Sequence, residues 1–244
     1  MTQSLCRLDD FKDNCGFGLI AHTKGKANHK LLQNAIKALT CMTHRGGVAA
    51  DGKTGDGCGL LLQKPDSFLR TVVKESLNIE LPELYAVGAI MLNSDSTLRD
   101  QSKKIIEQEL SAQGLEVIGW REVPTDDSCL GPIAIESLPA FEQVFIAPGK
   151  ILEQKIFSAR LYMGRRKAEN RLESDDTFHI ASLGINVLSY KGLMMPVDLP
   201  QFYTDLADPR LETAICVFHQ RFSTNTMPKW PLAQPFRMLA HNGE

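Results

Sequence analysis

The chain has 244 residues, of which 43% are hydrophobic and 23% charged, a composition that suits one large soluble α/β domain or two small ones. Its 27 basic and 29 acidic residues leave a net charge of −2, which excludes the basic footprint of a nucleic-acid-binding protein. No apolar run approaches the roughly 18 residues that span a bilayer, and the polar N-terminus lacks the apolar stretch of a secretion signal, so we expect a cytoplasmic protein with no membrane partner.

The six cysteines show no CxxC spacing, so the sequence predicts neither a zinc site nor an iron–sulfur site, and no other metal site, within this chain. In a reducing compartment they should be free thiols. They are Cys6, Cys15, Cys41, Cys58, Cys129 and Cys216.

The first feature along the chain is a polar leader, residues 1–14, followed by Cys15 and an apolar strand predicted over 17–22. A cysteine at the mouth of a strand is a candidate nucleophile. If the leader is removed after Asn14, Cys15 carries a free α-amine, which can serve as the general base for its own thiol. An α-amine with a pKa near 8 is roughly a tenth unprotonated at neutral pH. The alternative is a buried structural cysteine.

The next features are a helix and a glycine-rich loop. Apolar residues three or four apart predict a helix over 31–42 that ends before Gly46 and Gly47. Residues 47–54 match the phosphate-binding P-loop pattern, but that motif needs a preceding strand and a following helix. Here a helix precedes it and a strand over 60–63 follows, so we interpret the match as accidental.

The middle of the chain alternates helices and strands without a linker, which predicts one domain with strands at both ends. Ser96 is the expected N-cap of the third helix, and Ile151, Lys155, Ala159 and Tyr162 are expected to lie on one stripe of the fourth. Residues 178–190 are expected to form a strand pair or one long strand, with a turn at Lys191 and Gly192. The remaining expected helices cover 66–77, 96–113, 150–171 and 199–206, and the remaining strands 85–92, 116–122, 143–146 and 214–222.

Two late stretches place polar residues directly after apolar ones. Arg221, at the end of the last strand, suits bidentate capture of a carboxylate, although a surface ion pair is the commoner role. Asn242 and Gly243 offer a side-chain amide and an unhindered backbone N–H, the donors of an oxyanion hole. The alternative for the Asn-Gly pair is a tight turn.

Three blocks in this order resemble the glutaminase domain of class II glutamine amidotransferases, and more specifically the N-terminal domain of glutamate synthase large subunits. They are CGFGLIAH from Cys15; HRG at 44–46 with ADGKTGDGCGLL from Ala50; and HQRFSTNT from His219, continuing through KWPLAQPFR to HNGE at the end. The resemblance extends over essentially the whole chain.

The resemblance implies roles for these residues. Cys15 would attack the carboxamide carbon of L-glutamine and form a γ-glutamyl thioester with release of ammonia. Asn242 and Gly243 would form the oxyanion hole. Arg221 would hold the substrate α-carboxylate, and Arg45 and Phe222 would line the pocket.

The resemblance also implies an α+β fold of the N-terminal-nucleophile type, a four-layer αββα sandwich of mostly antiparallel sheets. It divides the chain into a removable pro-segment, 1–14, and an amidotransferase domain, 15–244, which is C-terminally incomplete. A downstream synthase domain of the same polypeptide would use the ammonia to convert 2-oxoglutarate to glutamate. That domain would carry FMN and an iron–sulfur cluster, and a small subunit or ferredoxin would supply electrons.

Two alternatives stay open at this point. One is another class II amidotransferase, against which the DGKTGDG block argues, and the other is a non-catalytic domain of the same fold. The presence of Cys15, Arg221 and Asn242 argues against the second.

Overall fold

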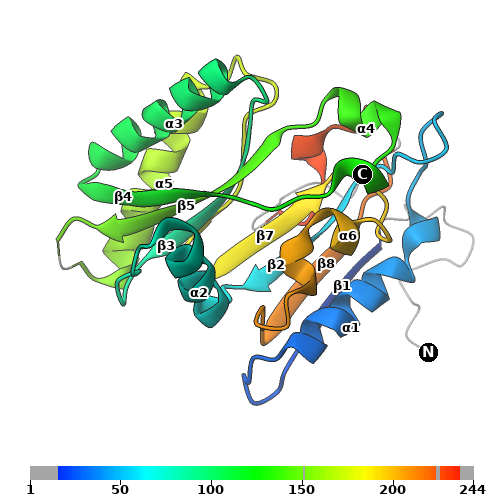
Figure 1. Cartoon of the computed structure of the whole chain (residues 1–244), viewed down its shortest axis with the longest axis horizontal. Helices are drawn as coiled ribbons and strands as arrows, with labels where there is room; N and C mark the ends of the chain where they lie inside the picture. The colour runs from blue at the N-terminus through cyan, green and yellow to red at the C-terminus, as the bar shows by residue number, and fades with distance from the viewer. Residues whose placement is uncertain (1–15, 151, 224–225, 237–244) are drawn as a thin grey trace, which may run out of the picture.

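The computed structural model describes residues 16–150, 152–223 and 226–236. In this part of the chain two four-stranded antiparallel sheets are formed, with strand orders β1-β8-β2-β7 and β4-β5-β3-β6 (Figure 1). The expected α+β class with mostly antiparallel sheets is confirmed. The strands are β1 (Gly16–Ala21), β2 (Cys58–Gln63), β3 (Ala86–Leu92), β4 (Leu115–Glu122), β5 (Ala140–Pro148), β6 (His179–Gly184), β7 (Val187–Gly192) and β8 (Ile215–Gln220).

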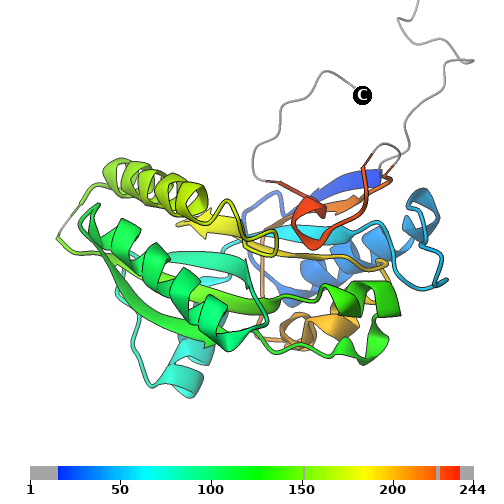
Figure 2. The same cartoon turned by 90° about the horizontal axis from the view of Figure 1, so that it is seen from above.

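Helices cover the sheets on more than one side, as Figure 2 shows from above. The α-helices are α1 (His29–Thr40), α2 (Asp66–Leu77), α3 (Ser96–Ser111), α4 (Pro132–Glu136), α5 (Gln154–Arg171) and α6 (Leu199–Phe202). Short 3₁₀ turns are η1 (Thr43–Arg45), η2 (Asp127–Cys129), η3 (Thr204–Ala207) and η4 (Trp230–Leu232). Within the described residues, no helix is both long and apolar enough to cross a bilayer.

One core joins both sheets. Alternate residues of β2, such as Leu60 and Leu62, and alternate residues of β3, such as Val87 and Met91, face the same buried cluster beneath α1 and α2. A second cluster fills the other face of the β4-β5-β3-β6 sheet, beneath α3 and α5. The sheet that holds β1 and β8 is therefore supported by α1 from one side.

The helices depart from the sequence predictions mainly at their ends. The α1 N-cap is Asn28, whose side chain accepts from the Leu31 amide at 2.8 Å. The predicted N-cap Ser96 is wrong. Asp95 caps α3 instead, because its carboxylate accepts from both the Thr97 and the Leu98 amides.

The predicted stripe of α5 as its buried face is also wrong, since Lys155, Ala159 and Tyr162 are exposed. The helix begins at Gln154, and its buried face is Phe157, Leu161, Gly164 and Ala168. Tyr162 is exposed, and Ile151 lies outside the described residues. The helix starts four residues later than predicted, and the face that carries Phe157 and Leu161 is buried because it packs on the second core cluster.

The predicted pair of strands over 178–190 is confirmed, but the two strands join different sheets. β6 pairs with β3, whereas β7 pairs with β2. The predicted turn at Lys191 and Gly192 is wrong, since both residues extend β7 and Lys191 pairs with Gly59. The chain thus crosses from one sheet to the other between Gly184 and Val187.

Candidate active site

The predicted site residues divide into two groups. Arg45, Arg221 and Phe222 are described by the structure, whereas Cys15, Asn242 and Gly243 lie outside the described residues. Strand β1 begins at the residue after Cys15 in the sequence, and its first residue, Gly16, pairs with Gln220 of β8. Gln220 directly precedes Arg221. The start of β1 therefore lies beside the end of β8, at one edge of the sheet.

Arg45 reaches this edge from η1, the turn that follows α1. A Cβ atom on Gly16 would lie 2.9 Å from the Met42 Sδ atom and 3.5 Å from the Arg45 Cβ atom. The end of α1 and η1 thus pack directly against the first residue of β1. Gly46, the residue after η1, packs against the Gln220 side chain at the end of β8. A Cβ atom on Gly46 would lie 1.7 Å from the Gln220 Nε2 atom, so only glycine fits at this position.

Asp56 ties together the loops on either side of this edge. Its Oδ2 atom accepts from the Gly47 amide at 3.1 Å and from the Ser223 amide at 2.7 Å. The carboxylate therefore fixes both the loop after η1 and the segment after β8. Asp56 is itself buried, at 8% exposure. Sequence reasoning missed this residue, although its place beside β2 in the DGKTGDG block was a signal.

Arg221 is held at the end of β8 by the same loop. Its backbone N–H donates to Gly57 O at 2.9 Å. Its guanidinium donates from Nη1 to Asp56 O at 3.4 Å and from Nη2 to Thr226 Oγ1 at 2.6 Å. These bonds fix a buried planar donor group beside the start of β1. Phe222, the next residue, is 37% exposed.

His219 and Gln220 are buried polar residues at the end of β8 that sequence reasoning did not assign. His219 Nδ1 and Gln220 Oε1 have no hydrogen-bond partner among the described residues. Burial, together with the neighbouring Arg221 guanidinium, lowers the pKa of His219 to about 4, so its imidazole is neutral at physiological pH. We call Arg45, Asp56, His219, Gln220 and Arg221 the Arg221 cluster.

The loop that matches a P-loop is folded around a carboxylate of its own. Asp51 Oδ1 accepts from the amides of Lys53 and Thr54, and Asp51 Oδ2 accepts from the Thr54 hydroxyl at 2.6 Å. These bonds, led by the one from the Thr54 hydroxyl, lower the pKa of Asp51. Backbone amides of this loop therefore already donate to the Asp51 carboxylate instead of to a phosphate. This agrees with the interpretation that the match to the P-loop pattern is accidental.

Comparison with known proteins identifies the family. Residues 15–244 match the family described as glutamine amidotransferases class-II. The chain belongs to this family. The relatives include the glutamate synthase [NADPH] large chain of Bacillus subtilis, 41% identical over 99% of this chain, and the ferredoxin-dependent glutamate synthase 2 of Synechocystis, 38% identical over 96%. The glutamate synthase [NADH] of Saccharomyces cerevisiae is 35% identical over 95%. The chain spans 16%, 15% and 11% of these three relatives, respectively.

Arg221 and Gln220 place a buried guanidinium and a buried amide side by side at the end of β8. A buried guanidinium offers two parallel N–H donors to a carboxylate, and the lower dielectric of a buried site strengthens that pairing. The described residues contain no group of three or more His, Cys, Asp or Glu side chains that could hold a metal ion.

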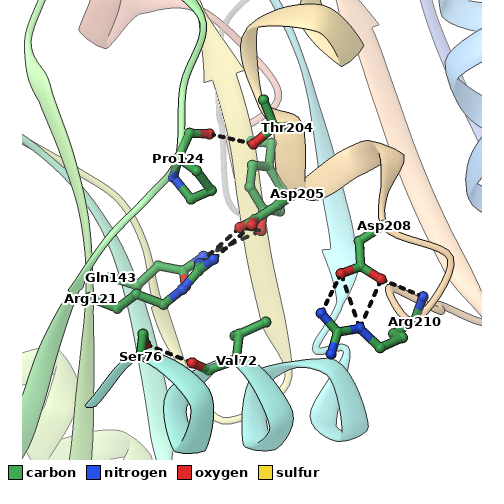
Figure 3. Close-up of polar contacts among 10 residues, drawn as sticks. Val72, Ser76, Arg121, Pro124, Gln143, Thr204, Asp205, Asp208 and Arg210 are labelled. Atoms are coloured by element: carbon green, nitrogen blue, oxygen red, sulfur yellow. Dashed lines mark hydrogen bonds and ion pairs between the residues drawn. The ribbon is translucent and has the colours of Figure 1, made fainter.

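A second buried polar group lies between the two sheets, formed by residues of β4, β5, β7 and η3. Arg121 donates to both carboxylate oxygens of Asp205, at 2.7 and 2.9 Å, and to Gln143 Oε1 at 2.9 Å (Figure 3). Tyr190 donates its hydroxyl to Asp205 Oδ2 at 2.9 Å. We call these four residues the Arg121 network. It contains no nucleophile, and its main acceptor, Asp205, is already used by Arg121 and Tyr190.

Proposed function

We propose that the chain is the glutaminase part of a glutamate synthase. In this proposal Cys15 attacks the carboxamide carbon of L-glutamine, ammonia leaves with the proton from the thiol, and water hydrolyses the γ-glutamyl thioester to glutamate. A downstream domain of the same polypeptide would add the ammonia to 2-oxoglutarate and reduce the product to glutamate.

The observation that carries this proposal is the position of Arg221. Strand β1, which starts immediately after Cys15, pairs with the strand that ends immediately before Arg221. A glutamine whose α-carboxylate is bound at Arg221 would be held near the start of β1, which is where a Cys15 nucleophile is needed. Arg45 and Phe222 would line the same pocket, and Asn242 and Gly243 would stabilise the oxyanion.

The role of the leader belongs to the same proposal. The family match starts at Cys15, which supports the division between residues 1–14 and the domain that follows. While Asn14 is attached, the nitrogen of Cys15 is an amide and has no basic lone pair. Removal of the leader would create the α-amine that accepts the thiol proton.

Cofactors and electron donors enter this proposal only through the longer enzyme. The relatives' names include an NADPH, an NADH and a ferredoxin-dependent form, so the name of the donor differs among them. We propose that FMN and an iron–sulfur cluster serve the synthase part, and that a small subunit or ferredoxin delivers electrons to it. A cytoplasmic location is part of the same proposal.

The decisive experiment replaces Cys15 by serine in the full-length enzyme. The Cys15→Ser variant should lose glutamine hydrolysis, because a serine hydroxyl is a far weaker nucleophile with the same base. Synthesis from added ammonia should survive, since it bypasses the amide-transfer step. Cys41→Ser is a matched control, because Cys41 is an exposed free thiol and should not matter. Retained glutaminase activity in Cys15→Ser would refute the proposed nucleophile.

A further inference from the structure

Gln220 is a buried glutamine whose side-chain amide is hydrogen-bonded at one end only. It is 1% exposed. Its Nε2 atom donates to the backbone oxygen of the next residue, Arg221, at 3.0 Å, whereas its Oε1 atom has no hydrogen-bond partner among the described residues. A buried amide oxygen without a donor lowers the stability of a fold, because the same oxygen is hydrogen-bonded to water in the unfolded chain. This position is therefore not optimised for stability.

The amide lies between the two segments that carry the arginines proposed for the glutamine pocket. Gln220 pairs with Gly16 of β1, and its side chain lies against Gly46, the residue that follows Arg45. A Cβ atom on Gly46 would lie 2.7 Å from the Gln220 Cδ atom and 2.9 Å from Arg221 O. The amide thus fills the space between the turn that ends at Arg45 and the backbone of Arg221.

The backbone of Arg221 depends on this amide. Arg221 follows the last residue of β8, so contacts outside the strand must fix its conformation. Its N–H donates to Gly57 O at 2.9 Å, and its C=O accepts from Gln220 Nε2. Since the two backbone dihedral angles of a residue set the direction of its side chain, the hydrogen bonds on either side of the Arg221 Cα atom together aim the guanidinium.

We propose that Gln220 is a positioning residue that aims the Arg221 guanidinium at the α-carboxylate of the amino-acid substrate. It does so by holding the Arg221 carbonyl and by packing against Gly46. The identity of the substrate in this inference rests on the proposed function. The stability lost through the unpaired Oε1 atom is of the kind that proteins tolerate at functional sites.

Gln143 provides a matched comparison, because it is a buried glutamine with both ends of its amide hydrogen-bonded. It is fully buried, its Oε1 atom accepts from Arg121 at 2.9 Å, and its Nε2 atom donates to the Tyr190 hydroxyl at 3.3 Å. Methionine has a similar length and flexibility but no amide. Gln143→Met therefore removes two hydrogen bonds of the Arg121 network, whereas Gln220→Met removes one hydrogen bond together with an unpaired oxygen.

The first measurement is the inhibition constant, Ki, of two competitive inhibitors of glutamine hydrolysis by the full-length enzyme. L-Glutamate carries the α-carboxylate, and 4-aminobutanoate is the same molecule without it. In Gln220→Met the Ki of L-glutamate and the KM of glutamine should rise roughly tenfold or more, because a misdirected guanidinium loses part of its charge-assisted pairing. The Ki of 4-aminobutanoate and kcat should change less than about threefold. Gln143→Met should leave all four values within threefold of wild type.

The second measurement is hydrogen exchange in the same full-length proteins, followed by mass spectrometry. Gln220→Met should speed exchange of the Arg221 amide by roughly tenfold or more and leave β4 and β5 as in wild type. Gln143→Met should speed exchange in β4 and β5 and leave the Arg221 amide unchanged. Gln220→Glu, which replaces only the donating NH₂ group by an oxygen, should act in the same direction as Gln220→Met, and it serves if the methionine variant does not fold.

The outcomes separate this proposal from the proposed function. Unchanged exchange at Arg221 in the Gln220 variants overturns the proposal, and so does faster exchange with an unchanged Ki for L-glutamate. Equal rises in the Ki of L-glutamate and of 4-aminobutanoate also contradict it, because they indicate a general loosening of the pocket. A wild-type enzyme without glutaminase activity, or an active Cys15→Ser variant, would refute the proposed function instead. Exchange at Arg221 would still decide whether Gln220 holds its backbone.

Discussion

Two arginines in the part of the chain that the structure describes, Arg121 and Arg221, are buried and have different hydrogen-bond partners. Arg121 is 7% exposed and Arg221 is 8% exposed. In the Arg121 network, the guanidinium forms a bidentate ion pair with the Asp205 carboxylate. This pair connects β4 to the segment after α6. In the Arg221 cluster, a backbone carbonyl and a hydroxyl orient the guanidinium at the end of a strand. Equal burial thus does not separate an arginine that pairs with a carboxylate of the fold from one that we propose to bind a ligand. Their surroundings do.

The largest effect that this comparison predicts is on stability. Arg121→Met leaves the Asp205 carboxylate buried without its counter-charge, which should cost about 3–5 kcal/mol of unfolding free energy. The measurement is urea-induced unfolding of the chain. Arg210→Met is the matched control, because Arg210 also pairs with a carboxylate, Asp208 (Figure 3), and with Glu75, but is about half exposed. It should cost no more than about 1 kcal/mol. Equal losses for the two variants would contradict the structural role of the network.

The next effect should appear in binding instead of stability. Arg221→Lys keeps the positive charge but loses the planar pair of donors, which is worth roughly 1.5–3 kcal/mol at a carboxylate. We expect the KM for glutamine to rise roughly 10- to 150-fold, measured by steady-state glutaminase kinetics. Arg121→Lys should show the reverse pattern, with lower stability and an unchanged KM. If Arg221→Lys leaves KM unchanged, Arg221 does not bind the substrate.

A smaller effect concerns pH. The pKa of His219 is about 4 in the folded protein, below its usual value of 6.5, because of burial and the Arg221 charge. Between these values the unfolded chain binds more protons than the folded one, so the unfolding free energy should fall as the pH falls from about 6.5 to 4. We expect this residue to contribute on the order of 1–2 kcal/mol after allowance for solvent screening.

The variant His219→Gln tests this contribution. It should have a flatter stability profile between pH 6.5 and 4 than the wild type, measured by urea unfolding at several pH values. Above about pH 7.5 the imidazole is almost entirely neutral in both states, so the slopes there should agree. His44→Gln, at an exposed position, is the control. A wild-type slope in His219→Gln would show that His219 is not the group responsible.

Local sequence patterns were sufficient for most elements of the fold. The apolar spacing of 31–42 placed α1 and its buried leucines, and the apolar run 85–92 placed β3. These segments are determined by periodicity, because a helix or strand must turn one face to a core wherever the core lies. The three sequence blocks and their order also led to the family, since they combine a cysteine, an arginine and an Asn-Gly pair in a fixed sequence.

The tertiary structure decided how these pieces meet. Periodicity could not show that β6 and β7 join different sheets, or that Lys191 lies inside one of them instead of in a turn. Nor could it show that the Asp56 carboxylate holds the loops on both sides of Arg221, because those contacts join residues far apart in the sequence. Local propensity acts over a few residues, whereas the pairing of β1 with β8 brings together residues about two hundred positions apart. Only that pairing places the strand that follows Cys15 beside Arg221.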